Sequence, residues 1–283
     1  MTVPDPGATV YVVSTPIGNL EDLSPRAQRV LREVSLIACE DTRHTARLCQ
    51  RYSIPTARVS LHAHNEARRV PELLDRLARG ESIALVSDAG TPLVSDPGER
   101  LVRAALEAGV PVVPVPGPSA ILAALVASGF ATGRFAFFGF LPRKGAERSR
   151  TIAALAAFPG SLVLFEAPNR AAATLADLHA ALGPRRVALA RELTKRHETV
   201  LRGVLGELAL DELRGELTIV VAGPAEQAPA EVTSEDVDAS VDRLLAAGLS
   251  ARDAARRLAA ETGLARRDAY ARVLARKPRG AES

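Results

Sequence analysis

The sequence predicts an α/β protein with two domains, followed by a small helical domain of helix-turn-helix type. Short β-branched runs alternate with amphipathic helical stretches, which is typical of largely parallel sheets covered by helices on both faces. The chain of 283 residues is also longer than one domain usually is. We expect an N-terminal α/β domain at 1–116, a second α/β domain at 117–226 and a helical tail domain at 232–283.

The first domain begins with a β-branched run that predicts a strand at 10–14. Ser24 and Pro25 are residue types that begin helices, and the helix that they start is expected to end at Val34. The same alternation predicts further strands at 36–39, 59–61 and 83–87 and further helices at 42–52 and 68–78.

A helix at 119–128 leads into the second domain, for which strands are predicted at 135–140, 162–166, 187–192 and 217–222. A linker at 227–232 precedes three short helices at 234–247, 250–261 and 265–275, with turns at Gly248 and Gly263. Helices joined by short glycine turns are typical of helix-turn-helix modules.

The composition excludes several classes of protein. Hydrophobic residues make up 47% of the chain and charged residues 24%, which excludes a disordered, collagen-like or coiled-coil protein. The apolar runs are shorter than the roughly 18 residues that a membrane helix needs, and residues 1–6 do not resemble a secretory signal. We therefore expect a cytoplasmic protein without a membrane span. Cys39 and Cys49 are expected as buried thiols, and no metal site is predicted.

Positive charge is concentrated near the C-terminal end. Residues 243–283 hold 10 basic and 4 acidic side chains, whereas the rest of the chain is slightly acidic. Two interpretations stay open: a surface that attracts nucleic acid, and an Arg-rich helical face that is only solvated.

Loops that follow strands are the first places to search for a ligand site, because ligands of open α/β sheets bind at the carboxyl ends of the strands. Three such loops, at 14–20, 87–98 and 115–120, are rich in glycine, proline and small residues. Asp88 and Asp96 in the second loop are candidates for holding a cation or hydroxyl groups. The first loop also has a simpler interpretation as a turn, and the third as a helix cap, whereas a run like the second rarely serves spacing alone.

Two later strands run into charged segments, at 164–170 and 190–198. Such groups are candidates for acid–base chemistry, with surface ion pairing as the alternative. Of the 36 basic residues, only Lys144, Lys195 and Lys277 are lysines. Because the pKa of a lysine shifts readily on burial, Lys144 and Lys195 are candidates for a base or a proton-sensitive anchor, unless their placement is chance.

Several familiar motifs are missing from the sequence. It contains no GxxxxGK[ST] phosphate loop and no GxGxxG after the first strand, so P-loop hydrolysis and an ordinary Rossmann cofactor site lose support. HExxH and GxSxG are missing as well.

Eight loop motifs together identify a family. They read STPIGNLEDLSPRA at 14–27, ACEDTRHT at 38–45, LHAHNE at 61–66, SDAGTPLVSDPG at 87–98, PGPSA at 116–120, FGFLPRKG at 138–145, FEAPNR at 165–170 and GELTIVVAG at 215–223. On these motifs the chain resembles the ribosomal RNA small subunit methyltransferase I family, the RNA-modifying branch of the tetrapyrrole methylase superfamily. The resemblance covers Val10 to Pro224, and the tail is similar to that family's C-terminal helical domain.

The resemblance implies the two-domain tetrapyrrole methylase-like fold of class III methyltransferases, with S-adenosylmethionine bound between the domains, and a homodimer. It implies 2'-O-methylation of a cytidine ribose, at cytidine 1402 in the decoding centre of 16S rRNA in the small ribosomal subunit. The loop reads AGTP followed by SDPG, where tetrapyrrole-methylating relatives read more like GGDP, and this departure favours an RNA substrate.

The resemblance also implies site residues by their position in these motifs. The cofactor-binding set is Pro16, Ala89, Gly90, Thr91, Val94, Ser119, Ala120 and Leu193. Methyl transfer to a ribose needs a group that takes the hydroxyl proton, and the nominated bases, in order, are Lys144, Glu166 and Lys195. Arg43, Arg143 and Arg170 are expected to contact RNA.

Two other functions stay open. A tetrapyrrole methyltransferase would share the fold and the cofactor but act on a flat acidic macrocycle, for which the Arg-rich tail has no evident use. A regulator without enzymatic activity would bind DNA through the tail and use the α/β body as a ligand sensor.

Overall fold

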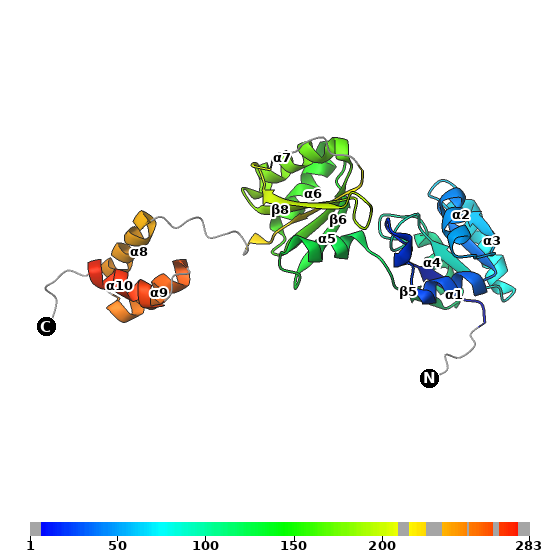
Figure 1. Cartoon of the computed structure of the whole chain (residues 1–283), viewed down its shortest axis with the longest axis horizontal. Helices are drawn as coiled ribbons and strands as arrows, with labels where there is room; N and C mark the ends of the chain where they lie inside the picture. Colours follow the sequence, from blue (N-terminus) through cyan, green and yellow to red (C-terminus); the bar gives the residue numbers. More distant parts are fainter. Residues whose placement is uncertain (1–6, 209–214, 225–233, 248, 263–265, 277–283) are drawn as a thin grey trace. The chain divides into compact units, whose positions relative to one another are not determined.

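The computed structural model describes residues 7–208, 215–224, 234–247, 249–262 and 266–276 (Figure 1). The chain divides into two compact units, residues 1–226 and 227–283. The predicted linker at 227–232 and the predicted turns at Gly248 and Gly263 lie outside the described residues.

The first unit begins with a five-stranded, fully parallel sheet of order β3-β2-β4-β1-β5. Its strands are β1 (Val10–Val13), β2 (Leu36–Cys39), β3 (Arg58–Ser60), β4 (Ile83–Val86) and β5 (Val112–Val115). Helices α1 (Pro25–Glu33) and α2 (Thr42–Arg51) share a core on one face, and α3 (Glu66–Ala78) and α4 (Glu99–Glu107) share one on the other. Strands β2 and β4 are covered on both faces and buried at every position, which explains their continuous apolar runs.

The order of the strands reverses at the middle of this sheet. From β1 the chain proceeds to β2 and β3 on one side, while β5 pairs with β1 on the other side. β1 and β4 are adjacent parallel strands, and from their carboxyl ends the chain continues toward opposite sides of the sheet. Such a switch point is where open α/β sheets bind ligands.

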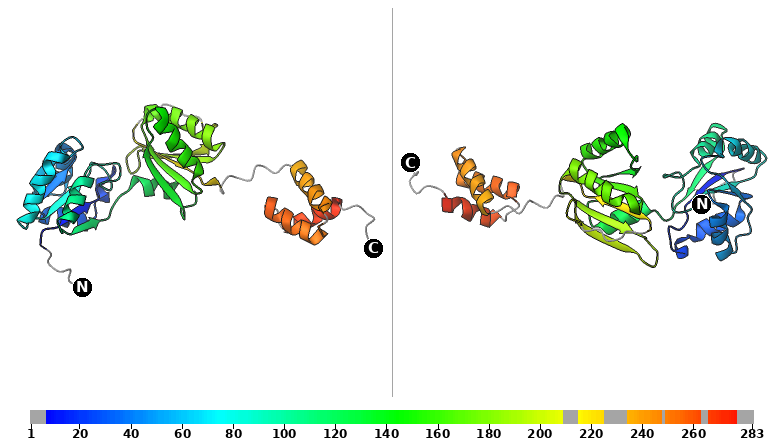
Figure 2. Two further views of the ribbon diagram at one scale, coloured as in Figure 1. Left: turned by 180° about the vertical axis from the view of Figure 1, so that it is seen from behind. Right: turned by 90° about the horizontal axis from the view of Figure 1, so that it is seen from above.

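The second sheet is mixed and has the order β6-β7-β10-β8-β9. Its strands are β6 (Phe135–Phe140), β7 (Ser161–Glu166), β8 (Arg186–Arg191), β9 (Thr199–Val204) and β10 (Leu217–Val221), of which β6 and β7 form the parallel pair. Helices α6 (Gly145–Ala157) and α7 (Ala171–Leu182) lie together over one face (Figures 1 and 2). Helix α5 (Ala120–Ser128) packs on the opposite face.

The predicted strands and helices are present with shifts of one or two residues at their ends. The structure adds elements that were not predicted: α4, β5, α6, α7, β9 and the short 3-10 helices η1 (Leu20–Asp22) and η2 (Pro168–Arg170). Strand β9 is an edge strand with two exposed positions, and it follows a charged segment that hides its pattern. The boundary expected between residues 116 and 117 falls in the connection from β5 to α5, and the domain limits stay a prediction.

The second unit has a core of its own. Helices α8 (Ser234–Ala246), α9 (Ala251–Thr262) and α10 (Arg266–Arg276) bury a shared set of apolar side chains. Arg276 of α10 forms ion pairs with Asp238 and Asp242 of α8, at 3.1 and 2.6 Å. Some of the basic charge in this unit therefore holds its own helices together.

Three expectations about the whole chain can be compared with the described residues. None of the helices among them is long and apolar enough to cross a membrane. Cys39 and Cys49 are buried free thiols, as expected, and burial raises the pKa of Cys39 to about 11. No group of three or more histidine, cysteine or acidic side chains in the described part of the chain is arranged to hold a metal ion.

Candidate functional site

The loops after β1 and β4 are joined to each other by backbone hydrogen bonds. The N–H of Thr15 donates to the carbonyl of Gly90 at 2.9 Å, and the N–H of Gly90 donates back to the carbonyl of Thr15 at 3.1 Å. The hydroxyl of Thr15 donates to the carbonyl of Ser87 at 3.1 Å. Thr15 and Gly90 are 75 positions apart in the sequence, and their pairing joins the two loops into one rigid edge at the switch point.

The loop after β4 is held in a strained conformation. Leu93 and Ser95 have positive φ angles of 75° and 68°, a backbone conformation that residues other than glycine rarely adopt. The buried carboxylate of Glu66 fixes the end of the loop, since it accepts hydrogen bonds from the N–H groups of Gly98, at 3.0 Å, and Arg100, at 3.3 Å. Such strain is maintained only where the surroundings impose it, and it concentrates at functional sites.

The third predicted loop meets the other two. The hydroxyl of Thr91 donates to the carbonyl of Pro118 at 3.3 Å, and the hydroxyl of Ser14 donates to the hydroxyl of Thr91 at 3.2 Å. Ser119 is the N-cap of α5, with its hydroxyl accepting from the N–H of Leu122 at 3.5 Å. Because α5 packs on the second sheet, this contact brings the N-terminus of that helix to the edge of the first sheet.

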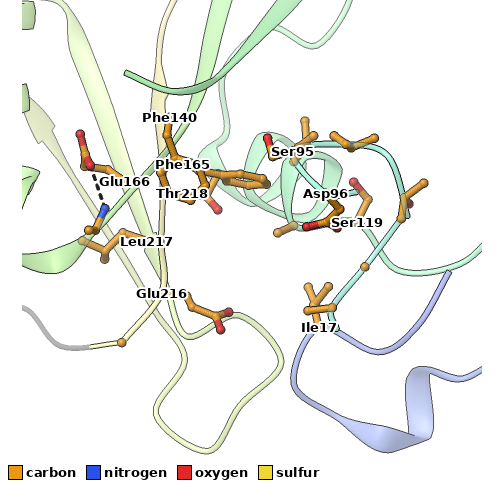
Figure 3. A pocket seen from close by; sticks show the side chains of 18 of the residues that line it. Ile17, Ser95, Asp96, Ser119, Phe140, Phe165, Glu166, Glu216, Leu217 and Thr218 are labelled. Carbon is orange, nitrogen blue, oxygen red and sulfur yellow. Dashed lines mark hydrogen bonds between the residues drawn. The ribbon is translucent and has the colours of Figure 1, made fainter. Parts of the chain in front are cut away.

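These loops and the second sheet enclose the main cavity, of about 430 Å³ (Figure 3). Its lining includes six of the predicted cofactor-binding residues: Ala89, Gly90, Thr91, Val94, Ser119 and Ala120. The wall from the second sheet consists of Phe140, Phe165, Glu166, Leu217 and Thr218 with their neighbours. Cavities of this size hold small-molecule ligands in proteins.

A second cavity of about 290 Å³ adjoins the first, since Ile17, Ala89 and Glu216 line both. Pro16 and Lys195, two further residues predicted for the site, line this second cavity. Leu193 lines neither of the two cavities and is 9% exposed, within the core that α5 shares with the second sheet.

Carboxylates gather on the first-sheet side of the main cavity. Asp96 lines the cavity, and Figure 3 shows its carboxylate beside Ser119, across from Phe165. Burial raises the pKa of Asp96, the negative charge of Asp88 raises it further, and a hydrogen bond from Ser87 acts in the opposite direction. Burial likewise raises the pKa of Glu40, to which the charges of Asp88 and Asp96 add. The cavity therefore contains a carboxylate that is more basic than usual.

The nominated base Glu166 is held by its neighbours. Its Oε1 accepts from the N–H of Ala167 at 2.8 Å and lies 3.3 Å from Nε of Arg170, and its Oε2 accepts from the hydroxyl of Thr174 at 2.5 Å. The side chain is fully buried, and in Figure 3 its carboxylate points away from Asp96 and Ser119. This geometry suits a carboxylate that fixes the start of α7.

The nominated base Lys195 is an ion-paired cation. Its Nζ lies 3.0 Å from Oε1 of Glu192 and 3.2 Å from Oε2 of Glu216. Burial lowers the pKa of Lys195, but the hydrogen bonds and charges of these two carboxylates outweigh it and leave the pKa above its ordinary value. An ammonium group that holds its proton this firmly is a poor base. The stem of Lys195 lies against Gly18, so the side chain is better suited to holding the loop after β8 against the loop after β1.

Lys144 and the three predicted RNA-binding arginines lie in different places. Lys144 and Arg143 are exposed in the loop between β6 and α6, and neither lines the two cavities. Arg43 is highly exposed and forms a 2.9 Å ion pair with Asp41, whose pKa its hydrogen bonds lower to about 2. Arg170 donates to the carbonyl of Leu141 at 2.6 Å besides contacting Glu166.

The structure thus brings most of the predicted cofactor-binding residues together and separates the three nominated bases. No observation tests the assigned roles directly, and they stay predictions. Sequence reasoning did not assign the aromatic wall, Phe140 and Phe165, or the position of Asp96 inside the cavity. The cluster of phenylalanines interrupted by Gly139 was the available signal.

Comparisons with known proteins agree with this geometry. Residues 9–209 match the family of Tetrapyrrole (Corrin/Porphyrin) Methylases, and residues 231–277 match the RsmI C-terminal HTH domain. The chain is 46% identical over 266 residues to Ribosomal RNA small subunit methyltransferase I of Synechocystis, covering 92% of this chain and 95% of the relative. It is 47% identical to the protein of that name from Pseudomonas aeruginosa, over 95% of this chain and 98% of the relative.

The fold resembles solved structures as well. Uroporphyrin-III C-methyl transferase from Thermus thermophilus, in complex with S-adenyl homocysteine, matches with a TM-score of 0.55 and 22% identity, over 75% of this chain and 97% of that one. At this identity the likeness concerns the fold. Together with the two matching family models, it confirms the predicted class III methyltransferase fold with a C-terminal helix-turn-helix domain.

Proposed function

Because the chain belongs to the ribosomal RNA small subunit methyltransferase I family of the tetrapyrrole methylases, we propose that it methylates the 2'-oxygen of a cytidine ribose in 16S rRNA. The enzyme is a methyltransferase that uses S-adenosylmethionine. The observation that carries the proposal is the main cavity, in which a carboxylate of raised pKa faces an aromatic wall. The expected nucleotide is the cytidine of the decoding centre named above.

The residues of the main cavity suit the cofactor. Gly90 leaves peptide groups uncovered, Ser119 begins a helix whose N–H groups favour an anion, and Asp96 supplies negative charge. S-adenosylmethionine carries an amino acid end and a sulfonium cation, so uncovered peptide groups and a carboxylate complement it. Ile17 and Phe165 add apolar surface for its adenine ring. When bound, the cofactor supplies an electrophilic methyl group.

The reaction needs the protein to align two atoms and to accept a proton from a weakly acidic hydroxyl. Enclosure in a cavity aligns reactants and removes competing water. We favour Asp96 as the proton acceptor, because it lies inside the cavity and its raised pKa makes it a stronger base than an ordinary carboxylate. Glu166 and Lys195 are engaged elsewhere, and Lys144 lies outside both cavities.

Substrate and partners form part of the same proposal. The names of the relatives refer to the RNA of the small ribosomal subunit, and the second unit matches a helix-turn-helix family model. We assign to that unit a sequence-independent attraction for RNA. A ribosomal substrate implies a cytoplasmic enzyme, and a homodimer is the expected assembly.

The test is transfer of labelled methyl groups to purified small subunits, to naked 16S rRNA and to uroporphyrinogen, with mapping of the modified nucleotide. Label at a 2'-oxygen of one cytidine is the expected result. Label on the macrocycle alone would assign the enzyme to tetrapyrrole chemistry. Label on neither, together with a shift of duplex DNA in a gel, would favour the regulator.

A further inference from the structure

Strand β6 breaks its pairing with β7 immediately before Phe140. The register of the pair shifts between Phe137 and Phe140, and Gly139 between them has a φ of 61°. A Cβ at Gly139 would lie 3.4 Å from Oγ of Ser95, so this irregularity is in contact with the strained loop after β4. Bulges of this kind redirect side chains next to active sites, and here the result is that Phe140 lines the main cavity.

The ring of Phe140 is supported on one side and open on the other. It lies 5.6 Å from the ring of Phe165, which packs at 4.8 Å against Phe137. Phe137 and Phe165 are partly buried, whereas Phe140 is 55% exposed, which is unusual for a phenylalanine. A fixed, exposed aromatic ring is the surface on which proteins stack the unpaired bases of RNA.

Two cations follow Phe140 in the loop that leads to α6. Arg143 and Lys144 are exposed, and neither forms an ion pair with a described residue. The loop itself is anchored, because Arg170 donates to the carbonyl of Leu141 at 2.6 Å and Arg148 donates to that of Pro142 at 2.9 Å. Cations presented on a fixed loop are well placed to bind phosphates.

We propose that Phe140 is the platform on which the base of the target nucleotide stacks, with Arg143 and Lys144 binding the adjoining phosphates. This inference rests on the proposed function, and it names the residues that bind the RNA substrate beside the cofactor. Charge indicates which ligand binds here. Arg143 and Lys144, which form no ion pair with a described residue, complement the polyanionic RNA, whereas the cofactor itself carries a sulfonium cation. Ser119, one of the six predicted cofactor-binding residues in the cavity, lies across the cavity from Phe140 and Phe165 in Figure 3.

The sequence provides a direct spectroscopic test. The chain contains no tryptophan, so Phe140→Trp introduces one reporter. Titration with a protein-free decoding-centre fragment of 16S rRNA should quench its emission by more than half, because a stacked base quenches indole fluorescence. The matched control is Phe135→Trp at the other end of β6, where the side chain is 38% exposed and lies outside the cavity. Its emission should remain unchanged, and equal quenching in both variants would overturn the inference.

Removal of the ring gives a second readout. Phe140→Ala should raise the KM for small subunits about five- to 150-fold, the range expected for loss of one stacked base, while Phe140→Tyr should restore it. Binding of S-adenosylhomocysteine, followed by calorimetry, should stay within twofold. Loss of that binding, or a change of oligomeric state in Phe140→Ala, would assign the ring to the cofactor or to a second copy of the chain and overturn the inference.

The outcomes separate this inference from the proposed function. If the unaltered enzyme transfers no methyl group to RNA, the proposed function fails and the inference fails with it. If the unaltered enzyme methylates RNA and the KM of Phe140→Ala is unchanged, only the inference fails.

Discussion

The two walls of the main cavity are built in different ways. The first-sheet wall consists of backbone held in strained loops, with Leu93 and Ser95 at positive φ and carboxylates behind them. The second-sheet wall consists of side chains on strands, such as Phe165 and Thr218, together with Glu166, whose carboxylate accepts a hydrogen bond from Thr174 of α7. A wall made of backbone and carboxylates suits the amino acid end and the sulfonium of the cofactor. The aromatic wall offers Phe165 to the adenine ring and the exposed Phe140 to a substrate that enters and leaves.

Among substitutions that test the difference between the two walls, the largest effect is expected at Asp96 in the first wall. We expect Asp96→Asn to lower kcat by about 10²- to 10⁴-fold, the usual contribution of a positioned base. The same change should stabilise the protein at neutral pH by about 1 kcal/mol, because it removes a partly buried charge near Asp88 and Glu40. Single-turnover kinetics and chemical denaturation measure the two effects.

Asp75→Asn, on the exposed surface of α3, is the matched control and should leave both quantities unchanged. If Asp96→Asn retains full kcat, the proton is accepted elsewhere, and Lys144 becomes the next residue to test.

The pH dependence of kcat and of stability should report the ionisation of Asp96 as well. The pKa of Asp96 lies above its ordinary value of 3.8, so kcat should begin to fall at a higher pH than an ordinary carboxylate would cause. The sign for stability is opposite, since protonation of Asp96 and Glu40 relieves buried charge, and stability from these groups decreases as pH rises through their folded pKa. Carboxyl carbon NMR titration checks both, and Asp41, with its pKa lowered to about 2, is the internal reference.

A smaller effect is expected at Gly90, where the first wall depends on backbone conformation. Its φ is 81°, and an added Cβ would lie 3.2 Å from Cγ2 of Ile17. Gly90→Ala should weaken S-adenosylhomocysteine binding about tenfold, because this loop of the cavity must shift to relieve both the contact with Ile17 and the left-handed conformation, which costs an alanine about 1–2 kcal/mol. Gly80→Ala is the control, because its φ is 87° and nothing lies within 4 Å. An equal loss of binding in both variants would show that general strain is responsible.

Glu166 tests whether the second wall contributes chemistry or only support. We expect Glu166→Gln to lower the free energy of unfolding by about 2 kcal/mol, because it weakens a buried pair with Arg170 and the bonds to Thr174. Activity per folded molecule should change by less than a factor of about five. A loss of kcat above a hundredfold in a folded variant would restore Glu166 as the base.

The smallest effect concerns the arginines beside the two walls. Arg143→Ala should reduce the slope of log affinity against log salt by about 0.7, the value for one phosphate contact on a single strand. Arg43→Ala should reduce it less, because Asp41 already engages that guanidinium at 2.9 Å. Filter binding to 16S rRNA at several salt concentrations measures the slopes, and equal slopes for the two variants would contradict the ranking.

The sequence predicted local structure well where one interaction dominates. Continuous apolar runs such as 36–39 and 83–86 identify strands buried on both faces, and Ser24 with Pro25 identifies a helix start. It did not identify β9, whose exposed edge positions break the pattern, or the raised pKa of Asp96. Burial and the charge of Asp88 set the pKa of Asp96, and both depend on contacts that form only in the folded chain.

The motifs of the sequence by themselves determined the family, the fold class, the cofactor and six of the residues that surround the main cavity. Backbone-shaping residues such as Gly90 and Ser119 act locally, so their function is visible in their order along the chain. Only the tertiary structure decided which charged groups are available for chemistry. Glu166 and Lys195 look alike as charges at strand ends, but folding gives each of them partners, whereas it places Asp96 inside the cavity. A side chain's chemistry depends on its neighbours in space, and those neighbours come from distant parts of the sequence.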